Sequence, residues 1–124
     1  MQFSEPLQFQ VRATDRFADL ADWMLRNLHG DLSVETLAQR ARLSPRQFSR
    51  RFRAAFGTSP GDYVERLRLD EARRRLPAGG QTVESIAVSV GYASDDAFRR
   101  AFERHFGVVP SAYRQQFSSR KQAS

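Results

Sequence analysis

The sequence predicts an all-α protein in which two helix-turn-helix subdomains are joined by a long linker helix, with about seven helices in all. Two observations carry this prediction. Apolar side chains recur along the chain at the three-to-four-residue spacing of a helix face, and no segment reads convincingly as a strand. In addition, one pattern of apolar residues, glycine and proline occurs twice.

The repeated pattern is long enough to define a structural unit. The first copy reads Val34-Glu35-x-Leu37-Ala38, then Phe48, Phe52, Phe56-Gly57, Pro60 and Tyr63. The second copy reads Val83-Glu84-x-Ile86-Ala87, then Phe98, Phe102, Phe106-Gly107, Pro110 and Tyr113. A single inserted residue, Ala93, accounts for the change of register between them. One unit is therefore present in two copies.

The first subdomain is expected over residues 15–58, after an N-terminal linker of residues 1–14. Its helices are expected at about 16–28, 33–41 and 45–56, and the first carries an apolar stripe of Phe17, Leu20, Ala21, Met24, Leu25 and Leu28, with Trp23 beside it in the core. Asp15, Ser33 and Ser44 can cap these helices, because their side-chain oxygens accept hydrogen bonds from free backbone N–H groups. A tight turn at Arg42 and Leu43 separates the second helix from the third.

The linker helix is expected over residues 59–77, and the second subdomain over residues 78–117. Ser59-Pro60 opens the linker helix with a cap and a proline at the first helical position, and Pro77-Ala78-Gly79-Gly80 breaks it. The helices of the second subdomain are expected at about 82–90, 94–106 and 110–117. Residues 118–124 are expected to be a disordered tail.

Composition points to a negatively charged partner. The formal net charge is +6, and every basic residue except Lys121 is arginine. The planar guanidinium group binds phosphate and guanine edges with two hydrogen bonds, which favours nucleic acid; a GC-rich genome explains part of the bias. Cysteine is absent, no apolar run approaches the roughly 18 residues of a membrane span, and no signal peptide is recognisable, so a soluble, cytoplasmic protein is expected.

The second helix of each helix-turn-helix is the candidate reader of duplex DNA. The first reader buries Phe48 and Phe52 and presents arginines at a spacing that suits a major groove about 12 Å wide. The second reader carries acids beside its arginines, which repel phosphate, so weaker or more selective binding is expected from it. The predicted base-reading residues are Arg46, Gln47, Ser49, Arg50, Asp96, Arg99 and Arg100. Asp96 either accepts from cytosine N4 or merely stabilises the start of its helix, as Asp95 is expected to do.

Further residues are candidates for contacts to the DNA backbone. These are Ser44, Arg51, Arg53, Ser94 and Arg104. Ser44 and Ser94 lie at helix N-termini, where free N–H groups can hold phosphate, although capping alone also explains both. The run Arg73-Arg74-Arg75 is better explained as a solvated helix C-terminus than as a DNA contact.

No motif supports an enzyme, a metal site or a cofactor. The sequence contains no nucleophile elbow, phosphate-binding loop or zinc-protease motif, and His29 and His105 have no acidic partner at metal spacing. The competing hypothesis is an arginine-rich helical protein-interaction module that binds an acidic partner.

These residues resemble the DNA-binding domain of the AraC/XylS family of transcription regulators over about residues 17–117. The second copy carries the most specific part, with Val90-Gly91-Tyr92, Phe98-Arg99-Arg100-Ala101-Phe102 and Phe106-Gly107-Val108-Val109-Pro110. The resemblance implies a monomeric DNA-binding domain whose two reader helices enter successive major-groove faces. Our hypothesis for the function is an activator that positions RNA polymerase at promoters. Arg42 departs from the family pattern, which usually has glycine there, so this turn is expected to be either strained in the left-handed conformation or differently shaped.

The N-terminal segment also resembles a known junction. Gln2-Phe3-Ser4-Glu5-Pro6-Leu7 and the helix start after Asp15 are similar to GlxA-type members of the family, in which an amidotransferase-like sensing domain precedes the DNA-binding part. This resemblance implies a fragment that lacks its sensor; a free-standing regulator is the alternative.

Overall fold

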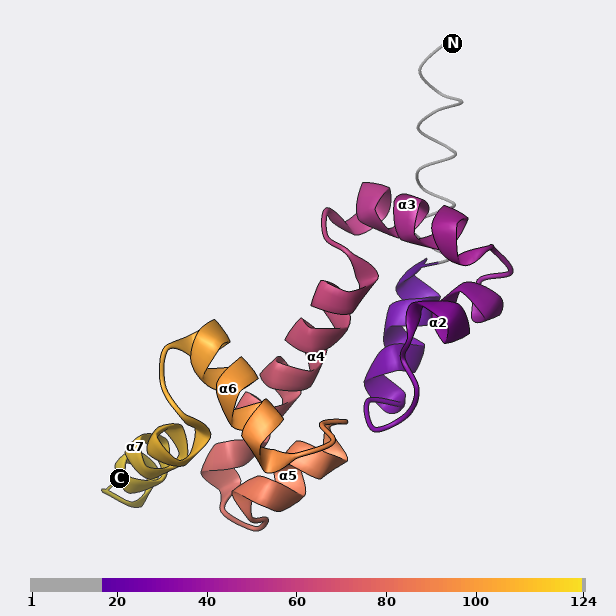
Figure 1. The fold of residues 1–124 in the computed structure, drawn as a ribbon. Coiled ribbons are helices and arrows are strands. Elements are labelled where there is room, and N and C mark those ends of the chain that lie inside the picture. The colour runs from indigo at the N-terminus through magenta and orange to yellow at the C-terminus, as the bar shows by residue number, and fades with distance from the viewer. Residues whose placement is uncertain (1–16, 124) are drawn as a thin grey trace. The chain divides into compact units, whose positions relative to one another are not determined.

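The structure is a computed structural model that describes residues 17–123, and the side chains of residues 17–118. A helix over residues 17–26 is followed by α2 (Val34–Arg40), α3 (Pro45–Phe56), α4 (Pro60–Arg75), a short 3-10 helix η1 (Leu76–Ala78), α5 (Val83–Ser89), α6 (Asp95–Phe106) and α7 (Pro110–Ala123) (Figure 1). These described residues contain no strand, which confirms the all-α prediction. The predicted linker over residues 1–14 and the cap at Asp15 lie outside the described residues.

The chain folds into two compact units. Among the described residues, the first unit comprises residues 17–27 and 31–65, and the second comprises residues 28–30 and 66–123. The boundary falls inside α4, because Val64 is buried in the first unit whereas Leu69 and Ala72 are buried in the second. The helix predicted as a linker therefore supplies core residues to both units.

The core of the first unit is aromatic. Phe17, from the first helix, lies with its ring centroid 5.7 Å from that of Phe48 and 5.6 Å from that of Phe52, and all three side chains are fully buried. Edge-on and tilted ring contacts at these distances add to the hydrophobic stabilisation. The prediction that Leu25 belongs to the buried apolar stripe is wrong, because its side chain is 49% exposed. Trp23 is only half-buried, with the guanidinium carbon of Arg40 4.0 Å from its ring centroid.

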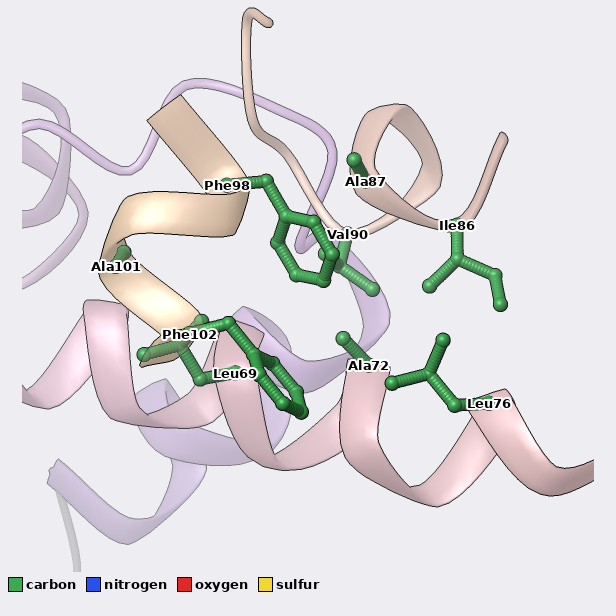
Figure 2. Packing of buried hydrophobic residues seen from close by; sticks show 9 residues of the cluster. All are labelled: Leu69, Ala72, Leu76, Ile86, Ala87, Val90, Phe98, Ala101 and Phe102. Atoms are coloured by element: carbon green, nitrogen blue, oxygen red, sulfur yellow. The ribbon is translucent and has the colours of Figure 1, made fainter. Parts of the chain in front are cut away.

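In the core of the second unit, aromatic side chains of α6 pack against aliphatic side chains of α4 and η1. Figure 2 shows the α6 side chains Phe98 and Phe102 packed over the α4 residues, with α5 closing the cluster. The buried cluster consists of Leu69, Ala72, Leu76, Ile86, Ala87, Val90, Phe98, Ala101 and Phe102. Because each large apolar side chain contributes about 1.5–3 kcal/mol when fully buried, this cluster holds the orientation of α6 firmly.

The helix boundaries follow the predicted capping residues. The side chains of Ser33, Ser44, Thr82 and Ser94 each accept a hydrogen bond from a backbone N–H in the first turn of the helix that they precede. Gly57 and Gly107 end α3 and α6 in the left-handed conformation, at φ 75° and 79°. A capping serine or threonine contributes about 1 kcal/mol, so local sequence sets where both reader helices begin.

The last helix is longer than the sequence predicts. The sequence predicts that this helix ends near Phe117 and that residues 118–124 are a disordered tail, whereas α7 continues to Ala123. No glycine or proline interrupts this segment, and the Ser118 hydroxyl donates a hydrogen bond to the carbonyl of Pro77 at 3.2 Å. This contact to a distant carbonyl is not readable from local sequence.

The arginine run at the end of α4 has a mixed role. Arg73 and Arg74 are exposed, as a solvated helix end requires, but Arg75 is half-buried. Its Nε lies 2.7 Å from Glu71 Oε2, and its Nη1 donates to the Ser89 hydroxyl of α5 at 2.9 Å. Burial raises the pKa of Glu71, but hydrogen bonds from Arg74 and Arg75 lower it more, so this pKa lies below its ordinary value. Arg75 thus ties α4 to α5.

Two further arginines satisfy carbonyl groups at helix ends in the second unit. Arg68 Nε donates to the carbonyl of Leu28 at 3.0 Å and its Nη2 to that of Gly30 at 3.1 Å. Arg114 Nε donates to the carbonyl of Leu76 at 2.8 Å. Carbonyl groups at helix ends lack partners within the helix, so these arginines stabilise the fold.

Among the helices of residues 17–123, none has both the length and the apolar character that a membrane-spanning segment requires.

Candidate nucleic-acid interface

The first reader, α3, is strongly two-sided. Phe48 and Phe52 are fully buried on one side. Arg46, Arg50 and Arg53 are exposed, and they recur at the spacing that places them on one helix face. The described part of α3 contains no acidic residue, so its guanidinium groups meet no carboxylate on their own helix.

Two other predicted base-reading residues of α3 are less available. The Gln47 side-chain oxygen accepts from the Ser44 N–H at 3.2 Å, while the Gln47 N–H donates to the Ser44 hydroxyl at 3.2 Å. This reciprocal capping box holds both side chains against the helix start. Ser49 is half-buried. The arginines therefore dominate the exposed chemistry of α3.

The second reader, α6, carries a local ion-pair cluster instead. Asp96 Oδ1 accepts from Arg99 Nη2 at 2.6 Å, and Asp96 Oδ2 lies 3.0 Å from Arg100 Nη2. The hydrogen bond from Arg99 and the charge of Arg100 hold the pKa of Asp96 below its ordinary value, so the carboxylate is ionised at neutral pH. The structure thus brings these three predicted base-reading residues together, with both guanidinium groups held against the Asp96 carboxylate.

Four of the predicted backbone-contacting residues are exposed and one, Arg51, is half-buried. Ser44 and Ser94 are exposed at the starts of α3 and α6, where each hydroxyl already accepts a helix N–H. Arg53 and Arg104 are exposed on α3 and α6 respectively. Arg51 is half-buried and lies about 100° around α3 from Arg50. Arg51 therefore points away from the exposed arginine face.

The turn between α2 and α3 and the turn between α5 and α6 differ in the residue that adopts positive φ. Arg42 has φ 61°, which is the left-handed one of the two alternatives expected for this turn, and it is the non-glycine residue with positive φ among the described residues. The equivalent Gly91 has φ 107°. A Cβ on Gly91 would lie 2.3 Å from the Leu28 carbonyl oxygen and 2.5 Å from Arg68 Nε. Only the second turn requires glycine for space as well as for conformation.

One residue of the first unit was missed by sequence reasoning. Arg40, at the end of α2, stacks on Trp23 and lies beside the turn that contains Arg42. Comparison of the two copies of the repeat could have drawn attention to Arg40, because the second copy has a small residue, Ser89, at the equivalent position. Within the described residues, no group of three or more His, Cys, Asp or Glu side chains is placed to hold a metal ion.

Two helix-turn-helix units, each with a capped, amphipathic second helix, define the chain as a double helix-turn-helix protein. A family model described as a helix-turn-helix domain matches residues 37–116. The HTH-type transcriptional regulator Rv1931c of Mycobacterium tuberculosis is 45% identical over 85 residues, which are 68% of this chain and 33% of that protein. The RCS-specific HTH-type transcriptional activator RclR of Escherichia coli is 41% identical over 83 residues, 67% of this chain and 29% of that protein.

Solved structures agree with the sequence relatives. The DNA-binding domain of AdpA, described as a global transcriptional factor and solved in complex with a target DNA, has a TM-score of 0.81 at 36% identity; the match covers 86% of this chain and 96% of that one. An AraC-type regulator from Chromobacterium violaceum has a TM-score of 0.77 at 27% identity, covering 87% of this chain and 96% of that one. The chain belongs to the AraC-type helix-turn-helix family. It spans about a third of the length of its sequence relatives.

Proposed function

We propose that this chain is the DNA-binding part of a sequence-specific transcription regulator. The observation that carries the proposal is the face of α3, where Arg46, Arg50 and Arg53 are exposed on a helix anchored by two fully buried phenylalanines. Arginine in the major groove recognises guanine through two hydrogen bonds to O6 and N7. The AdpA domain, solved with its target DNA, supports this function rather than a general protein-interaction module.

The two readers contribute differently in this proposal. The arginines of α3 supply the larger share of affinity, and α6 enters a second major-groove face after Arg99 and Arg100 exchange Asp96 for base edges or phosphates. Asp96 then either accepts from cytosine N4 or disfavours sites that place a phosphate near it. Ser44, Ser94, Arg53 and Arg104 contact the backbone, where they set the register of both helices without reading sequence.

The whole regulator is proposed to be longer than this chain, because the match covers only 33% and 29% of the two sequence relatives described above. A GlxA-type amidotransferase-like sensing domain before the DNA-binding part is the arrangement proposed from the N-terminal resemblance. We further propose that the regulator acts in the bacterial cytoplasm, that its isolated DNA-binding part is monomeric, and that it activates transcription by positioning RNA polymerase. The activator name of the RclR relative supports this last step.

Selection of bound sequences from a random duplex library tests the proposal. We expect one enriched motif, whose affinity falls with salt at a log-log slope of about −5 if roughly six phosphates are engaged. Arg50→Ala should cost about 1–3 kcal/mol on the selected duplex and much less on a shuffled one. Arg26→Ala removes the same charge from an exposed position of the first helix and is the matched control.

Two results would contradict the proposal at different levels. Selection without any enriched motif would remove sequence-specific recognition. An Arg50→Ala variant that loses equal affinity for the selected and the shuffled duplex would leave DNA binding intact but would show that the α3 face is not the reader.

A further inference from the structure

A basic groove lies on the first unit beside the turn between α2 and α3. One concavity of about 350 Å³ is lined by Arg40, Ala41, Arg42, Leu43 and Arg51. A second, of about 230 Å³, is lined by Asp19, Leu20, Trp23, Arg40 and Ala41. The two concavities adjoin at Arg40 and Ala41, which line both, and we call them together the turn groove.

The two ends of the turn groove differ in chemistry. Arg42 and Arg51 lie at one end, while Leu20 and the half-buried ring of Trp23 lie at the other. Arg40 stands between them with its guanidinium carbon 4.0 Å from the Trp23 ring centroid. The groove is separate from the reader face of α3, because Arg51 lies about 100° around the helix from Arg50 and further still from Arg46.

The second copy of the repeat shows that helix-turn-helix folding does not need these arginines. Its residues at the positions of Arg40, Arg42 and Arg51 are Ser89, Gly91 and Ala101. The Ser89 hydroxyl accepts from Arg75, Gly91 packs closely against the carbonyl of Leu28, and Ala101 is buried. In the second unit, the three equivalent positions are therefore packed against other residues of the chain, whereas in the first unit the three arginines line a concavity.

The backbone of Arg42 adds an independent observation. Its φ of 61° lies in the left-handed region, which is unfavourable for any side chain that is not glycine, asparagine or aspartate. The second turn avoids this cost with glycine. Strained residues of this kind cluster at functional sites, and here the strain projects a guanidinium group into the wall of a groove.

We propose that the turn groove binds an acidic peptide segment of a partner protein. Carboxylates of the peptide pair with the guanidinium groups of Arg42 and Arg51, and a neighbouring apolar side chain packs on the exposed part of Trp23. Asp19 lines the Trp23 end and repels a carboxylate there, which sets the direction of the peptide.

Charge argues against a second copy of this chain as the occupant. The chain has a net charge of +6, so two copies repel each other. Three of its acids, Asp70, Glu71 and Asp96, already pair with arginines on their own helices. A separate protein that carries several adjacent carboxylates is the complementary partner.

The test uses the full chain and its single tryptophan, Trp23, as the reporter. The probe is a blocked hexapeptide with leucine, glycine and then four aspartate or glutamate residues, and its neutral counterpart carries asparagine and glutamine instead. We expect a saturable change in Trp23 emission with the acidic peptide and none with the neutral one.

Variants taken from the second copy localise the binding. Arg42→Gly combined with Arg51→Ala removes two guanidinium groups, and glycine fits φ 61° without strain. We expect this double variant to bind the acidic peptide about tenfold more weakly. The matched control, Arg26→Ala with Arg66→Ala, removes the same charge from exposed positions outside the groove and should stay within about twofold of the parent. Should the double variant lose helicity, Arg42→Gly alone serves, with an expected loss of about threefold.

Several outcomes would overturn the proposal. These are an unchanged Trp23 emission, an equal loss in the control variant, and a sedimentation dimer that the double variant abolishes. A further one is a double variant that binds random duplex DNA more weakly but binds the acidic peptide unchanged, which would assign the groove to the DNA backbone. None of these outcomes depends on whether α3 and α6 read DNA sequence.

Discussion

Replacing Gly91 by alanine should destabilise the second unit far more than an ordinary glycine substitution. Gly91 has φ 107°, which a residue with a Cβ rarely adopts. The added Cβ would also lie 2.3 Å from the Leu28 carbonyl oxygen and 2.5 Å from Arg68 Nε, atoms that hydrogen-bond to each other at 3.0 Å. The substitution therefore strains the backbone and separates a hydrogen-bonded pair.

The magnitude follows from these two parts. A residue other than glycine in left-handed backbone costs about 1–2 kcal/mol, of which about 0.4–1 kcal/mol is offset by the lower entropy of the unfolded chain. Displacing the guanidinium from its carbonyl acceptor costs a further 1.5–3 kcal/mol or so. We expect a total of about 2–4 kcal/mol, a large share of the 5–15 kcal/mol that is typical of a small domain.

Urea unfolding followed by far-ultraviolet circular dichroism measures this effect. Gly79→Ala is the matched control, because Gly79 also has positive φ, at 76°, but nothing lies within 4 Å of its added Cβ. The control should lose about 1 kcal/mol, and the Gly91→Ala midpoint should fall roughly 1 M of urea below that of the control. Equal losses in the two variants would refute the packing argument and leave only the backbone term.

Three further predictions concern single side chains. Asp96→Asn should raise affinity for random duplex by about three- to tenfold and steepen the salt dependence, because it removes a negative charge and releases two arginines; an unchanged binding isotherm would contradict the competition described above. The folded pKa of Glu71 is depressed, so its stabilisation is complete above the ordinary value of 4.5 and is lost as pH falls through the folded pKa. The stability deficit of Glu71→Gln should therefore be about 1 kcal/mol at neutral pH and shrink below pH 4.5, whereas a pH-independent deficit in urea titrations would rule out the ion pair as its cause. Arg42→Gly should leave the free energy of unfolding unchanged or raise it by up to about 1 kcal/mol, because the relief of backbone strain exceeds the cost of the more flexible unfolded chain. A fall of more than about 1 kcal/mol in urea unfolding would show that the turn is not strained.

Most of the fold was predictable because local signals decide it. Serine before each reader helix, and glycine after it, set the ends of α3 and α6 within the two copies of the repeat. The period of the phenylalanines predicted which face of each helix is buried, and Phe48, Phe52, Phe98 and Phe102 are all fully buried. The end of α7 was predicted wrongly, because a long-range hydrogen bond from Ser118 contributes to it.

The candidate site was predictable only in part. Helical spacing correctly placed Arg46, Arg50 and Arg53 on the exposed side of α3, but it could not show that the Gln47 side chain turns back to the helix start. The pairing of Asp96 with its neighbours was open in the sequence, because spacing permits an ion pair without requiring one. Which bases these residues read stays a prediction.

The sequence by itself determined the double helix-turn-helix architecture, the helix ends and the basic character of α3. These depend on residues a few positions apart, whose interactions are set by helix geometry and capping. Tertiary structure alone decided that α4 divides its side chains between two cores, that Arg68 and Arg114 satisfy distant carbonyls, and that Arg40, Arg42 and Arg51 line one groove. The arginine–carbonyl contacts join residues about 40 positions apart in the chain, and all of these features arise only when the buried aromatic and aliphatic side chains pack.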